Sequence, residues 1–202
     1  MATPFEGITV LEYAGFVAGP YCGRLLADLG ADVLKVEAPG TGDTARSYGP
    51  FPGDIPHSEK SGLFLYLNLN KRSVTLDPST TTGKELFVRL AAKADVLIED
   101  SPPGRMAELG LGYTQLQGLN SSLVYVSVTP YGQTGPQVGW KAQHLNTFHA
   151  SGEGYTLPGG ATYAKFPDRP PVAGGANLGE YDAGIMAASG TVAALFAREV
   201  YG

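Results

Sequence analysis

The chain has 202 residues, of which 43% are apolar and 16% are charged, a composition typical of a globular protein of about one domain. Its formal net charge of −5 argues against a general nucleic-acid binder, which needs a basic face. The single cysteine, Cys22, cannot form a disulfide within the chain, which is typical of a reducing compartment. The N-terminus does not resemble a signal peptide, and no run approaches the ~18 apolar residues of a membrane span. We therefore expect a soluble, cytoplasmic protein that spans no membrane.

Strand-like and helix-like segments alternate along the first part of the chain. Short, mostly apolar runs predict strands at residues 8–13, 31–37, 73–77, 95–100 and 122–129. Helical patterns separate them at residues 19–30, 79–94 and 113–120, and a last helix is expected at residues 180–200. This alternation predicts an α/β fold with a doubly wound, Rossmann-like, mostly parallel sheet.

The helical patterns also predict which side chains are buried. In the first helix, Leu25, Leu26 and Leu29 share one face, and Gly30 is a stop signal. In the second, Ser79 or Thr80 is a candidate N-cap. Its expected buried face consists of Leu86, Phe87, Leu90 and Ala91.

We expect one domain over residues 1–202, with a long irregular region at residues 136–178 that has little periodicity. In doubly wound sheets, ligands bind beyond the carboxyl ends of the strands. The loops that follow the predicted strands are therefore the candidate binding segments.

The turn after the first strand, GFVAGPYCG, suggests a dinucleotide site but lacks its fingerprint. Its glycines, Gly15, Gly19 and Gly23, are four apart, so the close first pair of Gly-x-Gly-x-x-Gly is missing. Pro20 also removes a backbone donor that a pyrophosphate could use. The simpler interpretation is that these glycines allow a helix to pack tightly on a strand.

Several longer blocks carry a family resemblance. In order, they are VLEYAGFVAGPYCGRLLADLGADVLKVEAPGTGDTAR, NLNKRSVTLD, ADVLIEDSPPGRMAELGLGY, LVYVSVTPYGQTGP and GEYDAG. Their order and spacing resemble the family III CoA-transferases, a family that includes formyl-CoA transferase, carnitine CoA-transferase and α-methylacyl-CoA racemase. The resemblance covers nearly all of residues 6–200.

The resemblance implies a fold and partners. Family members have a large Rossmann-like domain and a smaller second domain, and two chains interlock as a dimer. This chain corresponds to the first half of the large domain and the helix after it. The resemblance thus implies a homo-oligomer, a second CoA-transferase-like chain that supplies the small domain, or a fragment.

The resemblance also implies a reaction. In the transferases a carboxylate attacks an acyl-CoA thioester, forms a mixed anhydride and then an enzyme–CoA thioester, and passes CoA to an acceptor acid. The substrates are acyl-CoA and a carboxylic acid, with no permanently bound cofactor and no metal. The nucleophile is an aspartate four positions before the glycine of a D-x-x-x-G pattern, and counting back from Gly184 gives Glu180. Glu180 and Asp182 can also be read as acids that merely favour the start of a helix.

The family's CoA-binding positions are occupied by Val17 and Ala18, by Asn68, Leu69, Asn70, Lys71 and Arg72, and by Asp100 and Ser101. Lys71 and Arg72 are the best phosphate candidates, because cationic donors suit phosphate oxygens. Two arginines of the family are Ala38 and Glu108 here, and its Asn-Phe pair is Asp100-Ser101. Arg46, Arg105, Lys141 and Lys165 are the cations that could compensate.

Three functions remain open. The first is acyl-CoA:carboxylate CoA transfer with Glu180 as nucleophile. The second is a non-catalytic subunit or half-domain that supports a catalytic partner, which the departures at Ala38, Asp100, Glu108 and Glu180 favour. Racemase chemistry is less favoured, because its histidine position is Gln143, which cannot transfer a proton, although His144 and His149 are close in sequence. Residues 151–175 are either a mobile wall of the site or a docking loop.

Overall fold

The computed structural model describes residues 3–157 and 164–201. Within them, five parallel strands form one sheet in the order β3-β2-β1-β4-β5. The strands are β1 (Thr9–Tyr13), β2 (Asp32–Glu37), β3 (Lys71–Thr75), β4 (Val96–Glu99) and β5 (Val124–Ser127). All five predicted strands are confirmed, but β3 begins and ends two residues before the predicted segment. It does so because Lys71 already pairs in register with Val33 of β2.

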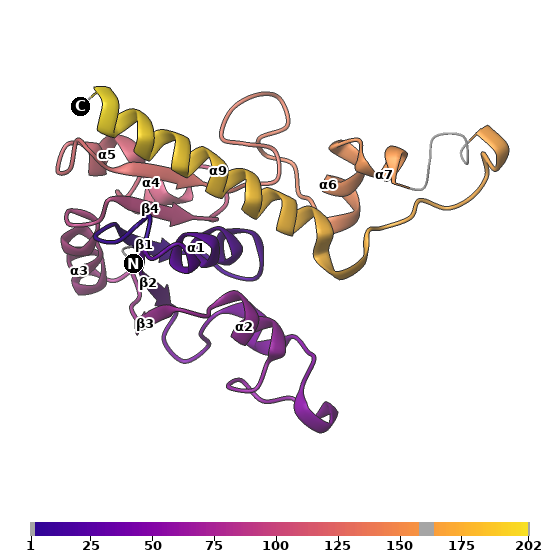
Figure 1. The fold of residues 1–202 in the computed structure, drawn as a ribbon, viewed down its shortest axis with the longest axis horizontal. Helices are drawn as coiled ribbons and strands as arrows, with labels where there is room; N and C mark the ends of the chain where they lie inside the picture. Colours follow the sequence, from indigo (N-terminus) through magenta and orange to yellow (C-terminus); the bar gives the residue numbers. More distant parts are fainter. Residues whose placement is uncertain (1–2, 158–163, 202) are drawn as a thin grey trace.

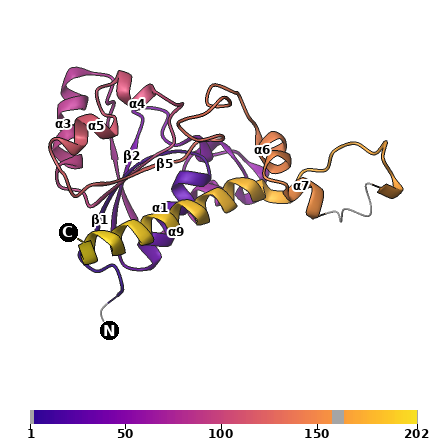
Figure 2. The same ribbon diagram turned by 90° about the horizontal axis from the view of Figure 1, so that it is seen from above.

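Helices cover both faces of the sheet, which confirms the doubly wound α/β class (Figure 2). One face carries α1 (Ala18–Asp28) and α9 (Leu178–Tyr201), and the other carries α3 (Thr81–Ala91), α4 (Arg105–Glu108) and α5 (Tyr113–Gln117). Each face has its own apolar core. Cys22, Leu26, Ile98 and Leu195 belong to the first core, and Phe87, Leu97, Met106 and Leu116 to the second.

The predicted helix faces are partly wrong. Leu26 is buried, but Leu29 lies just beyond α1 as its C-cap and is 40% exposed. In α3, Phe87 and Ala91 are buried, whereas Leu86 turns outward and is also 40% exposed. The N-cap of α3 is Thr80, whose hydroxyl accepts a hydrogen bond from the N–H of Gly83 at 3.1 Å.

The glycines of the first helix do permit close packing, as expected. A β-carbon on Gly19 would lie 2.4 Å from the β-carbon of Ala14, and one on Gly23 would lie 1.9 Å from a carboxylate oxygen of Glu12. Real β-carbons do not approach other atoms so closely. The glycines therefore let α1 lie directly against β1 and the turn that follows it.

The long helix α9 bears on the expectation that the chain spans no membrane. By length and composition alone, the helical segment Gly175–Tyr201 is long and apolar enough to cross one, a test that a core helix of a soluble protein also passes. In this fold α9 packs along α1 and buries Ala188 and Leu195. Its opposite side exposes Met186 and Phe196.

The segment between β5 and α9 projects beyond the sheet (Figure 1). Residues 136–178, expected to be irregular, contain α6 (His144–Ala150), α7 (Glu153–Thr156) and the short helix η3 (Gly175–Asn177), although residues 158–163 lie outside the description. The sequence also did not indicate α2 (Gly62–Leu67), η1 (Thr44–Ser47) and η2 (Pro52–Asp54). These pieces are too short to show an apolar period.

Candidate active site

The site begins at the turn between β1 and α1. The N–H of Gly15 donates a 2.9 Å hydrogen bond to Asp100 Oδ2, and the N–H of Phe16 donates one of 2.9 Å to Asp43 Oδ1. Phe16 has a φ of 60°, in the left-handed region that a bulky residue seldom adopts. Two carboxylates from other parts of the chain therefore hold this turn in an unfavourable backbone conformation.

A buried group of charges, here called the sheet cluster, lies beneath this turn. It consists of Glu12, Lys35, Asp43 and Lys71, whose side chains are at most 1% exposed. Lys35 Nζ lies 2.8 Å from Glu12 Oε1 and 2.7 Å from Asp43 Oδ2, and it donates to the carbonyl of Ala14 at 2.7 Å. Although burial opposes it, the two carboxylates raise the pKa of Lys35, so its ammonium stays charged and fixes the end of β1.

Lys71, a predicted phosphate ligand, is the second cation of the sheet cluster. Its Nζ lies 2.7 Å from Glu12 Oε2, 2.7 Å from the carbonyl of Pro20 and 3.0 Å from Asn68 Oδ1. Burial lowers the pKa of Lys71 to about 8. All three ammonium hydrogens therefore already have acceptors within the protein.

The other members of that predicted group lie at the surface. Arg72 forms an exposed ion pair with Asp32 at 2.6 Å, and the side-chain amide of Asn70 donates to Asp28 at 2.8 Å. Leu69 is 49% exposed. The structure does not bring residues 68–72 to the same cavity as Val17 and Glu180. Their contact with CoA stays a prediction.

Asp100, at the carboxyl end of β4, lies where the family carries asparagine. Burial raises the pKa of Asp100 to about 7, although the hydrogen bond from Gly15 and the charge of Lys35 act in the opposite direction. Asp100 and Ser101 together line a small cavity of about 270 Å³, which also includes Glu37 and Ala38. This cavity lies at the carboxyl edge of the sheet, where the fold class predicts ligands.

Glu180 lies in the first turn of α9. Ahead of it, Ala176 and Asn177 have positive φ values of 55° and 59°, so the chain turns sharply between η3 and the helix. Glu180 Oε2 lies 2.7 Å from Nδ1 of His144, the first residue of α6. The two side chains are 21% and 19% exposed.

Asp182 follows one position beyond Tyr181 and has a different partner. Burial, then a hydrogen bond and the charge of Asp182, raise the pKa of Glu153 in α7. The carboxyl groups of Glu153 and Asp182 therefore lie close to each other. A group of four side chains is here called the cavity cluster: Glu153, Asp182, Glu180 and the His144 that contacts Glu180.

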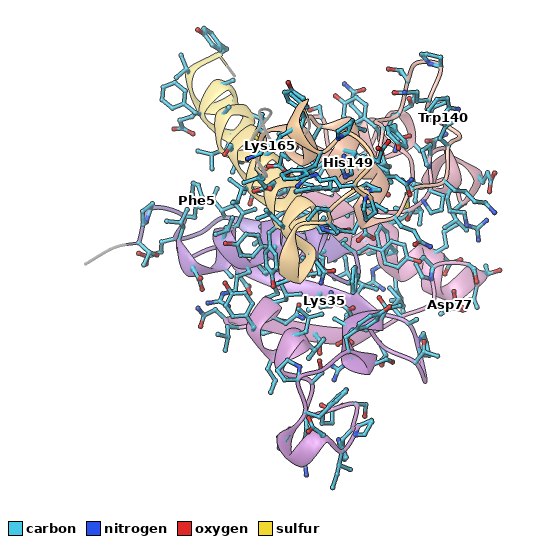
Figure 3. The ribbon with its side chains drawn as sticks, turned by 90° about the vertical axis from the view of Figure 1, so that its right-hand side faces the viewer. Phe5, Lys35, Asp77, Trp140, His149 and Lys165 are labelled. Atoms are coloured by element: carbon cyan, nitrogen blue, oxygen red, sulfur yellow. The ribbon has the colours of Figure 1, made fainter. Side chains whose placement is uncertain are left out.

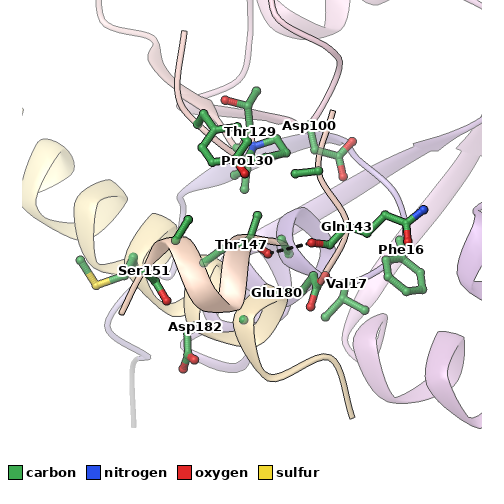
Figure 4. Close-up of a pocket in the computed structure, with 18 of the residues that line it drawn as sticks. Phe16, Val17, Asp100, Thr129, Pro130, Gln143, Thr147, Ser151, Glu180 and Asp182 are labelled. Carbon is green, nitrogen blue, oxygen red and sulfur yellow. Dashed lines mark hydrogen bonds between the residues drawn. The ribbon is translucent and has the colours of Figure 1, made fainter. Parts of the chain in front are cut away.

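A cavity of about 700 Å³ separates the turn after β1 from the start of α9 (Figure 4). Asp100, Thr129 and Pro130 lie on one wall, and Val17, Thr147 and Glu180 lie across from them. Ala18, Glu153 and Asp182 line it as well, so it brings together Val17, Ala18, Asp100 and Glu180 from the predicted site. None of its described lining residues is lysine, arginine or histidine.

Among residues 3–157 and 164–201, no group of three or more His, Cys, Asp or Glu side chains is arranged to hold a metal ion. The four compensating cations also fall elsewhere. Arg46, for example, binds Glu37 through two hydrogen bonds of 2.7 and 2.9 Å. The described residues of the cavity wall therefore offer carboxylates, hydroxyls, side-chain amides and apolar groups.

Sequence reasoning missed the sheet cluster and the role of Asp43. A signal was available, because Glu12 and Lys35 stand in the middle of parallel strands whose neighbours are apolar on both faces. A charge at such a position must be paired in the folded protein. Both residues are aligned in register on adjacent strands.

Comparison with known proteins identifies the family. A model of CoA-transferase family III matches residues 5–202 of the chain. The chain belongs to CoA-transferase family III. This family III chain is 38% identical over 198 residues to the succinyl-CoA–D-citramalate CoA-transferase of Chloroflexus aurantiacus, covering 97% of this chain and 46% of that protein. It is 37% identical over 202 residues to the formyl-CoA:oxalate CoA-transferase of Escherichia coli, covering 100% of this chain and 46% of that protein.

Solved structures agree with this assignment. The crystal structure of Rv3272 from M. tuberculosis matches with a TM-score of 0.85 and 37% identity, over 100% of this chain and 53% of that one. A CAIB/BAIF family protein from Brucella suis matches with a TM-score of 0.84 and 36% identity, over 98% of this chain and 50% of that one. The family III chain thus spans about half the length of the relatives it matches.

Proposed function

We propose that this chain takes part in moving CoA between carboxylic acids, with Glu180 as the nucleophile. The observation that carries the proposal is the place of Glu180 on the cavity wall, opposite Asp100 and beside the turn that bears Val17. This is the carboxyl edge of the parallel sheet, where the doubly wound fold binds ligands. A carboxylate at this position can attack a thioester as a nucleophile.

The reaction balances with one enzyme carboxylate. An oxygen of Glu180 attacks the thioester carbonyl, the carbon–sulfur bond breaks, and CoA leaves as a thiolate. The thiolate then attacks the Glu180 carbonyl of the mixed anhydride, which releases the donor acid and leaves a glutamyl-CoA thioester. The acceptor carboxylate attacks that thioester, and the resulting anhydride is opened by CoA to give the new acyl-CoA and free Glu180.

The residues at the turn would hold the reacting end of the substrate. Val17 and Ala18 line the cavity beside Glu180. We keep Asp100 and Ser101, and also Asn68, Leu69, Asn70, Lys71 and Arg72, as proposed contacts of the CoA moiety. We further propose a cytoplasmic, soluble protein that works as a homo-oligomer or with a second CoA-transferase-like chain, and acyl-CoA as substrate rather than a permanently bound cofactor.

One observation favours a second function, a non-catalytic half that supports a catalytic partner. The described lining of the cavity includes four acids, Asp100, Glu153, Glu180 and Asp182, and none of it is cationic. Lys71 is occupied by Glu12. An acidic wall repels an acceptor carboxylate, so the catalytic function requires a cation from elsewhere in the natural protein.

Racemase chemistry fits less well. An acid and a base that act on opposite sides of an α-carbon must be separated by the substrate. Here His144 and Glu180 touch each other at 2.7 Å, and Gln143 occupies the cavity wall. The pair is therefore not arranged as two separate proton-transfer groups.

Covalent trapping tests the proposal. The natural protein, with whatever further chain it carries, is incubated with a panel of acyl-CoA compounds and hydroxylamine, and its intact mass is measured. A hydroxamate mapped to Glu180, absent in Glu180→Gln and present in the exposed-acid control Glu108→Gln, is the expected result. An unmodified mass in folded protein would contradict the catalytic function and favour the supporting half.

A further inference from the structure

We propose that His144 is a positioning residue that orients the carboxylate of Glu180 toward the cavity. The inference rests on the proposed function of Glu180 and adds a second residue to it. His144 acts through Glu180 and does not line the cavity itself. Three contacts of its ring support this role.

Both ring nitrogens of His144 have partners. Nδ1 lies 2.7 Å from Glu180 Oε2, and Nε2 lies 2.9 Å from the carbonyl oxygen of Gly174. A carbonyl oxygen can only accept, so Nε2 carries its hydrogen and donates it to Gly174. The ring is therefore held at both ends, by the candidate nucleophile and by the backbone that leads into η3.

The faces of the ring are also constrained. The imidazole lies over Phe148, with ring centroids 5.7 Å apart and an interplanar angle of 34°. Phe148 is 2% exposed, and a β-carbon on Gly174 would lie 2.9 Å from its ring, so the glycine allows this close approach. Packing against Phe148 restricts rotation of the imidazole.

The start of α6 fixes the backbone that carries the ring. His144 is the first helical residue, and Gln143 and Asn146 form a capping box around it. In that arrangement the N–H of Gln143 donates to Asn146 Oδ1 at 3.1 Å. The capping box orients the first turn of α6, and the first turn orients His144.

The consequence for Glu180 is that its two oxygens become different. Oε2 is bound by His144, whereas Oε1 has no hydrogen-bond partner among the residues that the structure describes. A glutamate is one methylene longer than the family aspartate and has one more rotatable bond. A fixed Oε2 removes that freedom and leaves Oε1 available for attack, and misplacement by about 1 Å can lower a rate ~100-fold.

His149 provides an internal comparison. It comes from the same helix, and its Nε2 lies 3.1 Å from the carbonyl oxygen of Val172, two residues before Gly174. Both histidines thus fasten the same incoming segment to α6. His144, in contrast to His149, also contacts a carboxylate, so the pair separates a role in fastening the segment from a role in orienting Glu180.

The test compares three variants of the natural protein by the rate at which hydroxylamine converts the activated carboxyl of Glu180, as anhydride or CoA thioester, to a hydroxamate with release of the donor acid or CoA. His144→Phe keeps a ring over Phe148 and loses both hydrogen bonds, and we expect its trapping rate to fall ~100-fold with acyl-CoA affinity within about 2-fold of the original. His144→Asn keeps a donor near the position of Nδ1 and should recover at least about a tenth of the rate. His149→Phe should stay within about 3-fold.

Nitrogen-15 NMR of the histidine side chains gives a readout that does not need turnover. Glu180→Gln should shift the Nδ1 signal of His144 and leave His149 unchanged. Any one of four results would overturn the proposal. These are an unshifted His144 signal, full trapping in His144→Phe, no recovery of the rate in His144→Asn, and a loss in His149→Phe equal to that in His144→Phe. Absence of trapping in the unaltered protein would instead overturn the proposed function, and with it this role of His144, whereas the NMR signal would still report the contact.

Discussion

The molecule contains two groups of charged side chains whose settings differ. The sheet cluster combines two acids with two lysines, all at most 1% exposed, and each ammonium has three acceptors. Figure 3 shows Lys35 among the strands, apart from His149 of α6. The cavity cluster combines three acids with one histidine, and the His144–Glu180 pair is about one fifth exposed. In the sheet cluster, equal numbers of acids and lysines are bonded to one another and to the backbone, so the cluster holds the strands and the turn in place. In the cavity cluster, one carboxylate oxygen of Glu180 has no hydrogen-bond partner among the described residues, so it is available to react.

The largest expected effect comes from breaking the sheet cluster. Lys35→Met leaves Glu12 and Asp43 buried without their shared cation, which should lower the free energy of unfolding by about 3–5 kcal/mol. Urea denaturation measures the change. The control Arg72→Met removes an exposed pair with Asp32 and should cost less than about 1 kcal/mol. Equal losses in both variants would contradict the difference drawn between buried and surface pairs.

The next effect tests how closely α1 approaches the sheet cluster. Gly23→Ala would place a β-carbon 1.9 Å from Glu12, and overpacking of this kind lowers the free energy of unfolding by about 1–3 kcal/mol. Gly190→Ala is the matched change in α9, where nothing lies within 4 Å, and should stabilise by about 0.5–1 kcal/mol. Thermal unfolding of both variants measures these opposite signs. A stabilised Gly23→Ala would show that α1 can move away from β1.

A smaller effect concerns Asp100, which lies between the two clusters. Its pKa is about 7 in the fold and about 4 in an unfolded chain, so between these values the folded state binds the proton more tightly. Stability contributed by this group therefore falls as pH rises from about 4 to 7. Asp100→Asn should stabilise the protein by about 1–2 kcal/mol at pH 8 and much less at pH 4, after allowance for partial exposure. The same gain in unfolding temperature at both pH values would refute the ionisation argument.

The smallest effect on stability is expected at the proposed nucleophile. Glu180→Gln should change the free energy of unfolding by less than about 1 kcal/mol, because the side chain is 21% exposed and an amide oxygen can still meet His144. The same variant should lose all trapping by hydroxylamine. Chemical denaturation measures the free energy of unfolding, and intact mass measures trapping by hydroxylamine, both on one preparation of the variant. A loss as large as that of Lys35→Met would mean that Glu180 is structural.

Most of the fold was predictable because it follows from local patterns. The five strands and the helices α1, α3, α5 and α9 have apolar periods or stop signals long enough to read. Leu29 and Leu86 were assigned to the wrong side, because the pattern does not show where a helix ends or which turn meets the sheet. The helix α6 contacts the segment before α9 through His144 and His149, and α7 packs against α6. The contacts of the two histidines join residues far apart in the chain and leave no local sequence pattern.

Only those residues of the candidate site that match the family's sequence motifs were predictable. Val17, Ala18, Asp100 and Glu180 do line one cavity. Lys71 was expected to face a ligand, but its side chain is buried and its ammonium contacts Glu12, the carbonyl of Pro20 and Asn68. The contact of His144 with Glu180 joins residues 36 apart in the chain, and spacing alone does not reveal it.

The turn at Phe16 has a consequence for ligand binding. A bulky residue with a positive φ costs of the order of 1–3 kcal/mol. The N–H groups of Phe16 and Gly15 donate hydrogen bonds to Asp43 and Asp100, and Lys35 donates one to the carbonyl of Ala14, so these bonds hold the turn in place. These bonds form within the protein when it folds. The turn is therefore preorganised. A ligand that binds against Val17 contacts a loop that is already ordered, so binding does not incur the conformational entropy loss of ordering it.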